Sequence, residues 1–424
     1  MGNTSWVIAQ HVVQMLVSLV VGSLSARYLG PANYGSINYA ASFVSLFSSI
    51  TSLGMDGVII KKMVDHPERE GEYLGSCLGF RMISGLFSMV SILSLVYFLN
   101  PGETATFWIC ALYSISVIFH SFETINYWFR RHLKSKYPCI AKIIAYLVMS
   151  AYKIYLLATG KSVYWFALSN VLDHFVLFVV VYLFYRKNKA PSLRFSFHSG
   201  MEVLKESYHF ILSGLMVALY GQMDRIMLNS MLGQETVGFY SAANTICTMW
   251  IFVPSAMINS SRPLLMEMKK KDEGMYLRRL KQLYSALIWL CIAVSFGVLI
   301  FGPLAIRILY GSAFDSASNA LRILIWCEVF SMIGSARGIW IITENKNKYI
   351  KYYLIYGVAV NAVLNLILIP RFGICGAAVA TLVTQVVTSL IAPLFYKETR
   401  IHTKYVIEAF LLKWFFEKNE KKEL

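Results

Sequence analysis

Residues 29–40 read LGPANYGSINYA, and residues 232–243 read LGQETVGFYSAA. Both stretches follow the pattern L-G-x4-G with an Ala five residues after the second Gly, and their offset is 203 residues. Glycine at these positions permits a tight turn with positive φ. The alternative to a true repeat is that the pattern recurs by chance, because the chain is rich in Gly and Ala. We interpret the pair as an internal repeat, because the offset corresponds to six of the membrane spans that the remaining sequence predicts.

Apolar stretches of about twenty residues, long enough to cross a ~30 Å hydrocarbon core as a helix, recur along the whole chain. Of 424 residues, 57% are hydrophobic and only 15% are charged, whereas soluble domains are about a quarter charged. Mean hydropathy is +0.56. The sequence therefore predicts an all-α integral membrane protein of about twelve transmembrane helices. The predicted spans are 6–27, 36–60, 75–99, 105–127, 138–158, 162–185, 207–231, 238–261, 282–302, 319–342, 350–370 and 375–396.

The basic residues orient these spans. Even-numbered connections and the tail hold 28 Lys and Arg residues, and the odd-numbered connections hold four. Cytoplasmic loops carry the excess of Lys and Arg, so both termini are predicted to be cytoplasmic. The net charge of +16 alone would suggest a nucleic-acid partner, but this loop bias already explains it, and none is expected. The seven Cys residues show no metal-ligand spacing, and we expect the first apolar stretch to be a span and not a cleavable signal.

The repeat divides the predicted spans into two equal groups in the same orientation. We expect an N-terminal six-helix bundle over 1–203 and a C-terminal six-helix bundle over 204–396. The remaining residues, 397–424, form a basic cytoplasmic tail in which Tyr405–Phe416 is a candidate interfacial helix. Parallel repeats of this kind accompany a central site and alternating access in transporters.

Several local patterns resemble those of one family, the Wzx-type oligosaccharide flippases of the multidrug/oligosaccharidyl-lipid/polysaccharide superfamily. They occur in order from the first span to the twelfth. They are ARYLGP at 26–31 with Tyr34-Gly35, SLGMD at 52–56, DRIML at 224–228 leading into Leu232-Gly233, VGFYS at 237–241, LYGSAF at 309–314 with Ala317, and PRFGICGAA at 370–378.

The resemblance implies two six-helix bundles around a central cavity. It implies a flippase that moves undecaprenyl-diphosphate-linked oligosaccharide repeat units to the periplasmic leaflet of a bacterial inner membrane. The polymer would be O-antigen, lipopolysaccharide, capsule or exopolysaccharide, and the sugar is not specified. Expected partners are the lipid-linked oligosaccharide, membrane lipids and, as further candidates, a polysaccharide polymerase and a chain-length regulator. No catalytic residue, metal or cofactor is implied, and proton or sodium coupling is left open.

Charged residues inside spans are the candidate functional residues, because charge in hydrocarbon is costly. A permanently charged Arg fork suits the diphosphate of such a cargo. The candidates for a cationic cavity are Arg225, Arg337, Lys153, Arg81 and Arg322. For Arg81 and Arg322, near span ends, the alternative is a side chain that extends to the headgroups. For Arg337 the alternative is an ion pair with Glu328, and for Arg225 a charge pair that fixes span seven to its neighbours.

Carboxylates in spans are the candidates for ion coupling, because a titrating or sodium-binding group can link cargo movement to a gradient. They are Asp56, Glu123, Asp173 and Asp224. Asp224 and Arg225 are adjacent, so they point about 100° apart on a helix and cannot pair ideally. Each is therefore expected to have another partner.

Two other functional classes were weighed. A membrane glycosyltransferase or polymerase needs a substantial loop that carries catalytic residues, whereas the predicted periplasmic loops are short and contain no recognised catalytic motif. We therefore expect no enzyme. A multidrug or cation exporter of the same superfamily would favour carboxylates over arginines in its cavity, and it remains the open alternative.

Overall fold

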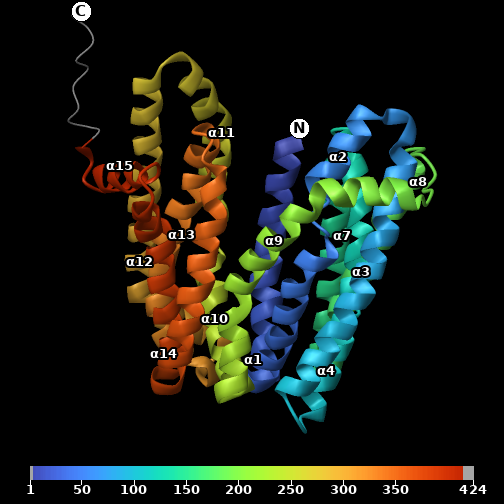
Figure 1. The fold of residues 1–424 in the computed structure, drawn as a ribbon. Helices are drawn as coiled ribbons and strands as arrows, with labels where there is room; N and C mark the ends of the chain where they lie inside the picture. Colours follow the sequence, from blue (N-terminus) through green and yellow to red (C-terminus); the bar gives the residue numbers. More distant parts are fainter. Residues whose placement is uncertain (1–2, 414–424) are drawn as a thin grey trace, which may run out of the picture. The chain divides into compact units, whose positions relative to one another are not determined.

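The structure, a computed structural model, describes residues 3–413 and is helical throughout, with no strand in that range (Figure 1). The chain divides into two compact units, unit 1 (Met1–Gly238) and unit 2 (Phe239–Leu424). The predicted fold class, an all-α membrane protein, is confirmed by the long apolar helices described next.

Unit 1 contains nine α-helices, and α10 begins within it. They are α1 (Asn3–Thr51), α2 (Asp56–Asp65), α3 (Glu70–Leu99), α4 (Thr104–Ser114), α5 (Ser116–His120), α6 (Ile125–Arg131), α7 (Lys136–Ala158), α8 (Val163–Lys187), α9 (Phe197–Leu232) and α10 (Gln234–Thr248). Short 3-10 turns, η1 (Pro67–Arg69) and η2 (Ser121–Thr124), interrupt them.

The described part of unit 2, up to residue 413, contains the end of α10 and five further α-helices. They are α11 (Phe252–Lys271), α12 (Glu273–Tyr310), α13 (Ala317–Thr343), α14 (Ile350–Val386) and α15 (Arg400–Phe410). Four single turns lie between them: η3 (Ser312–Phe314), η4 (Asn347–Tyr349), the π-helical η5 (Val387–Ile391) and η6 (Ala392–Phe395).

Helices α1 and α14 each carry parts of two predicted spans, and each is kinked at a glycine. The backbone of α1 turns at Gly30 (φ 72°) before Pro31, and that of α14 turns at Gly373 (φ 57°) after Pro370. Among the described residues, eight helical segments are long and apolar enough to span a membrane, or nine if the bent pair α10 and α11 counts as one. With α1 and α14 each counted twice and the less apolar α9 included, all twelve predicted spans fall on helices.

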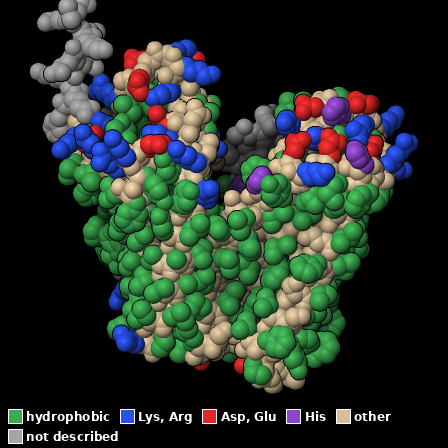
Figure 2. Space-filling model, in the orientation of Figure 1, with side chains coloured by type: hydrophobic (Ala, Val, Ile, Leu, Met, Phe, Trp, Pro, Cys, Tyr) green, Lys and Arg blue, Asp and Glu red, His purple; other side chains and the backbone are tan. Residues whose placement is uncertain are grey.

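The surface of each unit matches a membrane environment (Figure 2). Large apolar side chains that a soluble protein would bury are exposed along single helices, such as Phe87 and Val90 on α3 and Ile300 and Phe301 on α12. Charged side chains gather instead at the ends of the helices. The chain is therefore an integral multi-pass membrane protein.

The unit boundary lies later in the chain than the six-plus-six division places it. Helix α9 holds the seventh predicted span, yet it packs against α1 and α3 within unit 1. The tail begins with α15, whose His402, Val406 and Ala409 are buried, with Val406 and Ala409 in the core that α12 and α13 form. The candidate interfacial helix Tyr405–Phe416 overlaps α15, and its last residues, 414–416, lie outside the described residues.

Candidate functional site

The fourth membrane span of unit 1 is broken at its centre. From Thr104 to Arg131 it passes through α4, α5, the 3-10 turn η2 and α6. A 3-10 helix has three residues per turn, so side chains three positions apart lie on the same face, and such turns inside long helices often mark functional hinges. The turn therefore places His120 and Glu123 side by side.

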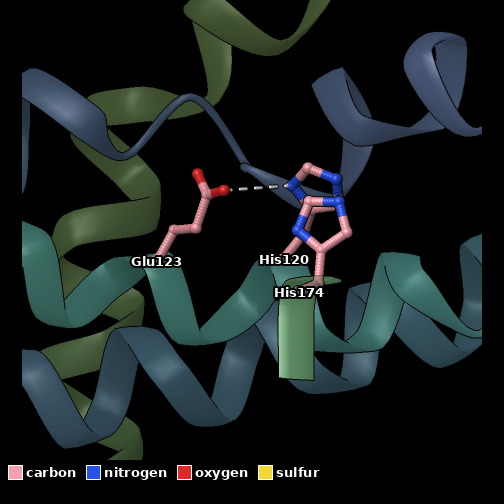
Figure 3. Close-up of side chains that lie close together, drawn as sticks. All are labelled: His120, Glu123 and His174. Atoms are coloured by element: carbon pink, nitrogen blue, oxygen red, sulfur yellow. Dashed lines mark ion pairs between the residues drawn. The ribbon is translucent and has the colours of Figure 1, made fainter. Parts of the chain in front are cut away.

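His120 and Glu123 meet a second histidine from a neighbouring helix (Figure 3). Nδ1 of His120 lies 3.5 Å from Oε1 of Glu123. The ring of His174, on α8, lies with its centroid 4.1 Å from that of His120. One ligand atom from each of the three residues can be chosen so that all lie within 4.8 Å of one another. We call these three residues the His-Glu-His cluster.

Three small cavities lie among the helices of unit 1, and each is lined by ionisable groups. The first, of about 10 Å³, contacts Glu123 and His174 together with Asn126. The second, of about 70 Å³, contains Lys153 of α7 and Asp173 of α8. Sites for drug-sized ligands run to about 300–1,000 Å³, so these two cavities are the size of an ion or a few water molecules.

The third cavity, of about 160 Å³, lies between α1, α6 and α7. Its lining includes His11, Arg130 and Lys142, and it shares Asn126 with the first cavity. Lys142 is close enough to act electrostatically on Glu123 and His174. The interior of unit 1 therefore carries cationic and anionic groups inside the membrane-spanning segments.

Arg81 is buried within unit 1, and its Nη atoms donate to protein groups, while its Nε has no hydrogen-bond partner among the described residues. Its Nη1 donates to Thr124 Oγ1 and to the Tyr127 hydroxyl, at 3.2 Å each. The same Tyr127 hydroxyl donates to Asp56 Oδ1. Arg81, Tyr127 and Asp56 thus form one chain of hydrogen bonds that ties α3 and α6 to the start of α2. The Arg81 guanidinium therefore lies among protein groups.

Asp224 and Arg225 are adjacent on α9 in unit 1. Asp224 is buried. The half-buried Arg225 donates from Nη1 to Gln222 Oε1 at 2.8 Å, and Gln222 in turn donates to Ser45 Oγ of α1 at 3.1 Å. The Nε of Arg225 is buried and makes no hydrogen bond with the described residues.

Arg337, on α13 of unit 2, bonds to backbone and not to Glu328. Its Nη1 donates to the carbonyl oxygens of Thr388 at 2.5 Å and Ser389 at 3.5 Å. Pro393 has no N–H to offer the Ser389 carbonyl four residues earlier, so Arg337 supplies a donor that the proline lacks. The guanidinium also lies 4.4 Å from the Tyr353 ring centroid. This geometry stabilises the π-helical turn η5.

The remaining candidate, Arg322, is exposed near the start of α13. Within unit 1 the structure thus brings together Glu123 with His120 and His174, Lys153 with Asp173, and, through Tyr127, Arg81 with Asp56. Arg225 lies on α9 of unit 1, and Arg337 and Arg322 belong to unit 2. Sequence reasoning missed His120 and Asn126. The i, i+3 spacing of His120 and Glu123 was a usable signal, but their proximity to His174 depends on how α5 and α8 pack.

The two copies of the repeated motif contact each other reciprocally within unit 1. A Cβ built on Gly35 would lie 1.8 Å from the carbonyl oxygen of Gln234, and one built on Gly238 would lie 2.1 Å from that of Pro31. Pro31 and Gln234 occupy the third position of their copies, and Gly35 and Gly238 the seventh. Ser36 donates to the Gln234 side chain at the same contact. Equivalent positions therefore exchange equivalent contacts, as a local two-fold relation requires.

Comparison with known proteins gives the family and the fold. Residues 1–269 match the family described as polysaccharide biosynthesis protein. A probable low-salt glycan biosynthesis flippase of Haloferax volcanii is 26% identical over 197 residues, which is 46% of this chain and only 42% of that protein. A capsular polysaccharide biosynthesis protein of Staphylococcus aureus is 21% identical over 413 residues, 93% of this chain and 98% of that protein.

Among solved structures, the lipid II flippase MurJ in an inward closed conformation matches with a TM-score of 0.70. The match has 14% sequence identity and covers 98% of this chain and 91% of that chain. At this identity the likeness shows the fold alone.

Proposed function

Because the chain belongs to the polysaccharide biosynthesis protein family, we propose that it moves undecaprenyl-diphosphate-linked oligosaccharide repeat units from the cytoplasmic to the periplasmic leaflet of a bacterial inner membrane. Relatives of this family are named flippases and capsular polysaccharide biosynthesis proteins. The chain is a transporter and not an enzyme. Its termini lie in the cytoplasm in this proposal, in accord with the distribution of Lys and Arg.

The observation that carries the proposal is the set of ionisable side chains inside the membrane-spanning helices of unit 1. Lys153 and Asp173 share one cavity, and Glu123 lines another. Ionisable residues at membrane depth are costly, and they mark the paths of polar cargo and coupling ions. A protein that only anchored other components in the bilayer would have no need of them.

The cationic candidates differ in how free they are to contact a diphosphate. Arg81 and Arg337 donate to groups on other helical segments, so we assign them structural roles, whereas Arg225 donates to Gln222 of its own helix. Arg225, Lys153 and the exposed Arg322 remain as the residues that neutralise the cargo. Of these, Arg225 carries a planar guanidinium whose fork can hold two phosphate oxygens.

Coupling to a proton or sodium gradient is assigned to the carboxylates of unit 1. Asp173 is the first candidate, because Lys153 in the same cavity can exchange its interaction with Asp173 for one with phosphate. Glu123 is the second. Asp56 accepts the Tyr127 hydrogen bond, and Asp224 is buried on α9, so both have weaker claims.

Alternating access completes the proposal. The two-fold contact of the repeated motifs would separate when the protein opens to the periplasm, and the lipid tails would stay in the bilayer throughout. A polysaccharide polymerase and a chain-length regulator that receive the flipped unit are proposed partners.

Deletion of the gene in its own host tests the function. We expect lipid-linked oligosaccharide to accumulate in the cytoplasmic leaflet and surface polysaccharide to disappear, and a plasmid copy to restore both. Unchanged surface polysaccharide with increased sensitivity to cationic drugs would contradict the proposal and favour the exporter.

A further inference from the structure

We propose that the His-Glu-His cluster, His120, Glu123 and His174, is a binding site for a divalent transition-metal ion of the Zn²⁺ type. Two imidazoles and one carboxylate are a donor set that Zn²⁺ uses widely, whereas Mg²⁺ and Ca²⁺ prefer sites made of oxygen atoms alone. The site lies within unit 1 and is separate from the cavity that holds Lys153 and Asp173.

The distances agree with such a site. Zn–N and Zn–O bonds of about 2.0–2.2 Å in tetrahedral geometry place neighbouring ligand atoms about 3.4 Å apart. Nδ1 of His120 and Oε1 of Glu123 are already 3.5 Å apart. The three ligand atoms lie within 4.8 Å of one another. A rotation of the His174 ring or a shift of its side chain by about 1 Å, small beside the rotamer changes common at binding sites, would complete the triangle.

A second observation points to a ligand at this place. Asn126, one turn after Glu123, lines the same cavity and is only 8% exposed. Its Oδ1 is buried and accepts no hydrogen bond from the described residues. Buried polar atoms nearly always have a partner, so this oxygen calls for a water or an ion. The cavity of about 10 Å³ holds one water-sized group, which would be the fourth ligand.

The residues around the His-Glu-His cluster would hold a bound ion in place and restrict its contact with water. Phe119, Phe122 and Phe178 also line the cavity, so the ion would sit against apolar walls that restrict water. Arg81 donates from Nη2 to the His120 carbonyl oxygen at 3.5 Å and holds this residue in the broken span. The positive charge of Lys142 would repel the metal ion, and the negative charge of the Glu123 carboxylate offsets that repulsion.

Metal binding would join η2 to α8. His120 and Glu123 belong to the break in the fourth span, and His174 belongs to a continuous helix. An ion that bonds to both would fix the broken segment.

The test is a Zn²⁺ titration of the full chain, purified with a tag free of histidine, in lipid nanodiscs and metal-free buffer. Isothermal calorimetry should give one Zn²⁺ per chain. His120→Ala, Glu123→Gln and His174→Ala should each weaken binding at least tenfold. His198→Ala, at an exposed histidine of the same unit, is the matched control and should change affinity less than twofold.

A spectroscopic readout separates a lost ligand from a misfolded protein. Co²⁺ in place of Zn²⁺ should give the visible absorption of a four-coordinate site with nitrogen ligands in the wild type. His174→Gln, which keeps a polar side chain and should elute normally in size-exclusion chromatography, should lose that absorption. Equal Zn²⁺ affinity in the wild type and the three cluster variants, or no binding by the wild type at micromolar Zn²⁺, would overturn the proposal. None of these readouts depends on transport.

Discussion

The Cα of Gly35 faces the backbone of Gln234 so closely that a Cβ at position 35 would lie 1.8 Å from the Gln234 carbonyl oxygen. Real Cβ atoms do not approach oxygen to that distance, and the obstacle is backbone, so Gly35→Ala must separate α1 from the α9–α10 turn. We expect a loss of about 1–3 kcal/mol in stability, as for other overpacked sites. Thermal unfolding in detergent would show it.

Gly238→Ala should behave in the same way, because its Cβ would lie 2.1 Å from the Pro31 carbonyl oxygen. Gly221→Ala, on α9 with nothing within 4 Å of the added carbon, is the control and should melt like the wild type. If Gly35→Ala and Gly221→Ala melt together, the motif contact does not exist in the protein.

Removal of the Arg337 side chain should lower the stability of the protein, and any loss of transport should follow from that. Arg337→Ala would leave the carbonyl oxygens of Thr388 and Ser389 without this donor, at a cost of about 1–3 kcal/mol. Arg337→Lys should restore part of the melting temperature. Arg322→Ala, on the same helix but exposed, is the control for stability. An unchanged melting temperature for Arg337→Ala together with lost transport would instead place Arg337 against the cargo.

Lys153 and Asp173 should be required for transport and not for accumulation in the membrane. Lys153→Met leaves Asp173 without the cation in its cavity, and we expect flipping to fall about tenfold, the equivalent of about 1.4 kcal/mol. Lys153→Arg should retain most activity. Lys161→Met removes an exposed lysine at the end of the same helix pair and should have no effect. If Lys153→Met cells contain the wild-type amount of protein and make normal surface polysaccharide, the cavity of Lys153 and Asp173 has no role in transport.

His402 should make unit 2 sensitive to acid. Burial against Tyr284 and Trp340 lowers the pKa of His402 well below its ordinary value of 6.5, and the charge of Arg337 lowers it further. The unfolded chain therefore takes up a proton below pH about 6.5 while the folded chain does not, so stability falls as pH decreases, by at most about 1.4 kcal/mol per pH unit. The melting temperature measured from pH 7.5 to 5 should fall less steeply in His402→Gln. A steeper fall in that variant would contradict this assignment.

The membrane spans could be predicted from the sequence, because hydropathy, Gly and Pro residues at span ends, and loop charge are all local signals. The kinks at Gly30 and Gly373 fall where the predicted spans end. The assignment of α9 to unit 1 was not accessible, since it depends on packing against α1 and α3 rather than on any property of its own residues.

The candidate site was predicted only in part. Charge inside a span singled out Glu123, Lys153 and Asp173, because such residues stand out against apolar neighbours. It could not show that α8 brings His174 to His120 and Glu123. The sequence also could not distinguish Arg337, which donates to the Thr388 carbonyl oxygen, from an arginine that contacts cargo.

The most direct test of the central claim is a flipping assay with the purified chain in proteoliposomes. A fluorescent undecaprenyl-diphosphate-linked oligosaccharide is placed in both leaflets, and a membrane-impermeant reagent quenches the outer pool. The account predicts that the protected fraction falls when the chain is present, faster with an imposed proton or sodium gradient, and that Arg225→Ala slows the exchange. A protected fraction equal to that of protein-free liposomes, with the chain shown to be folded by its melting transition, would contradict the account.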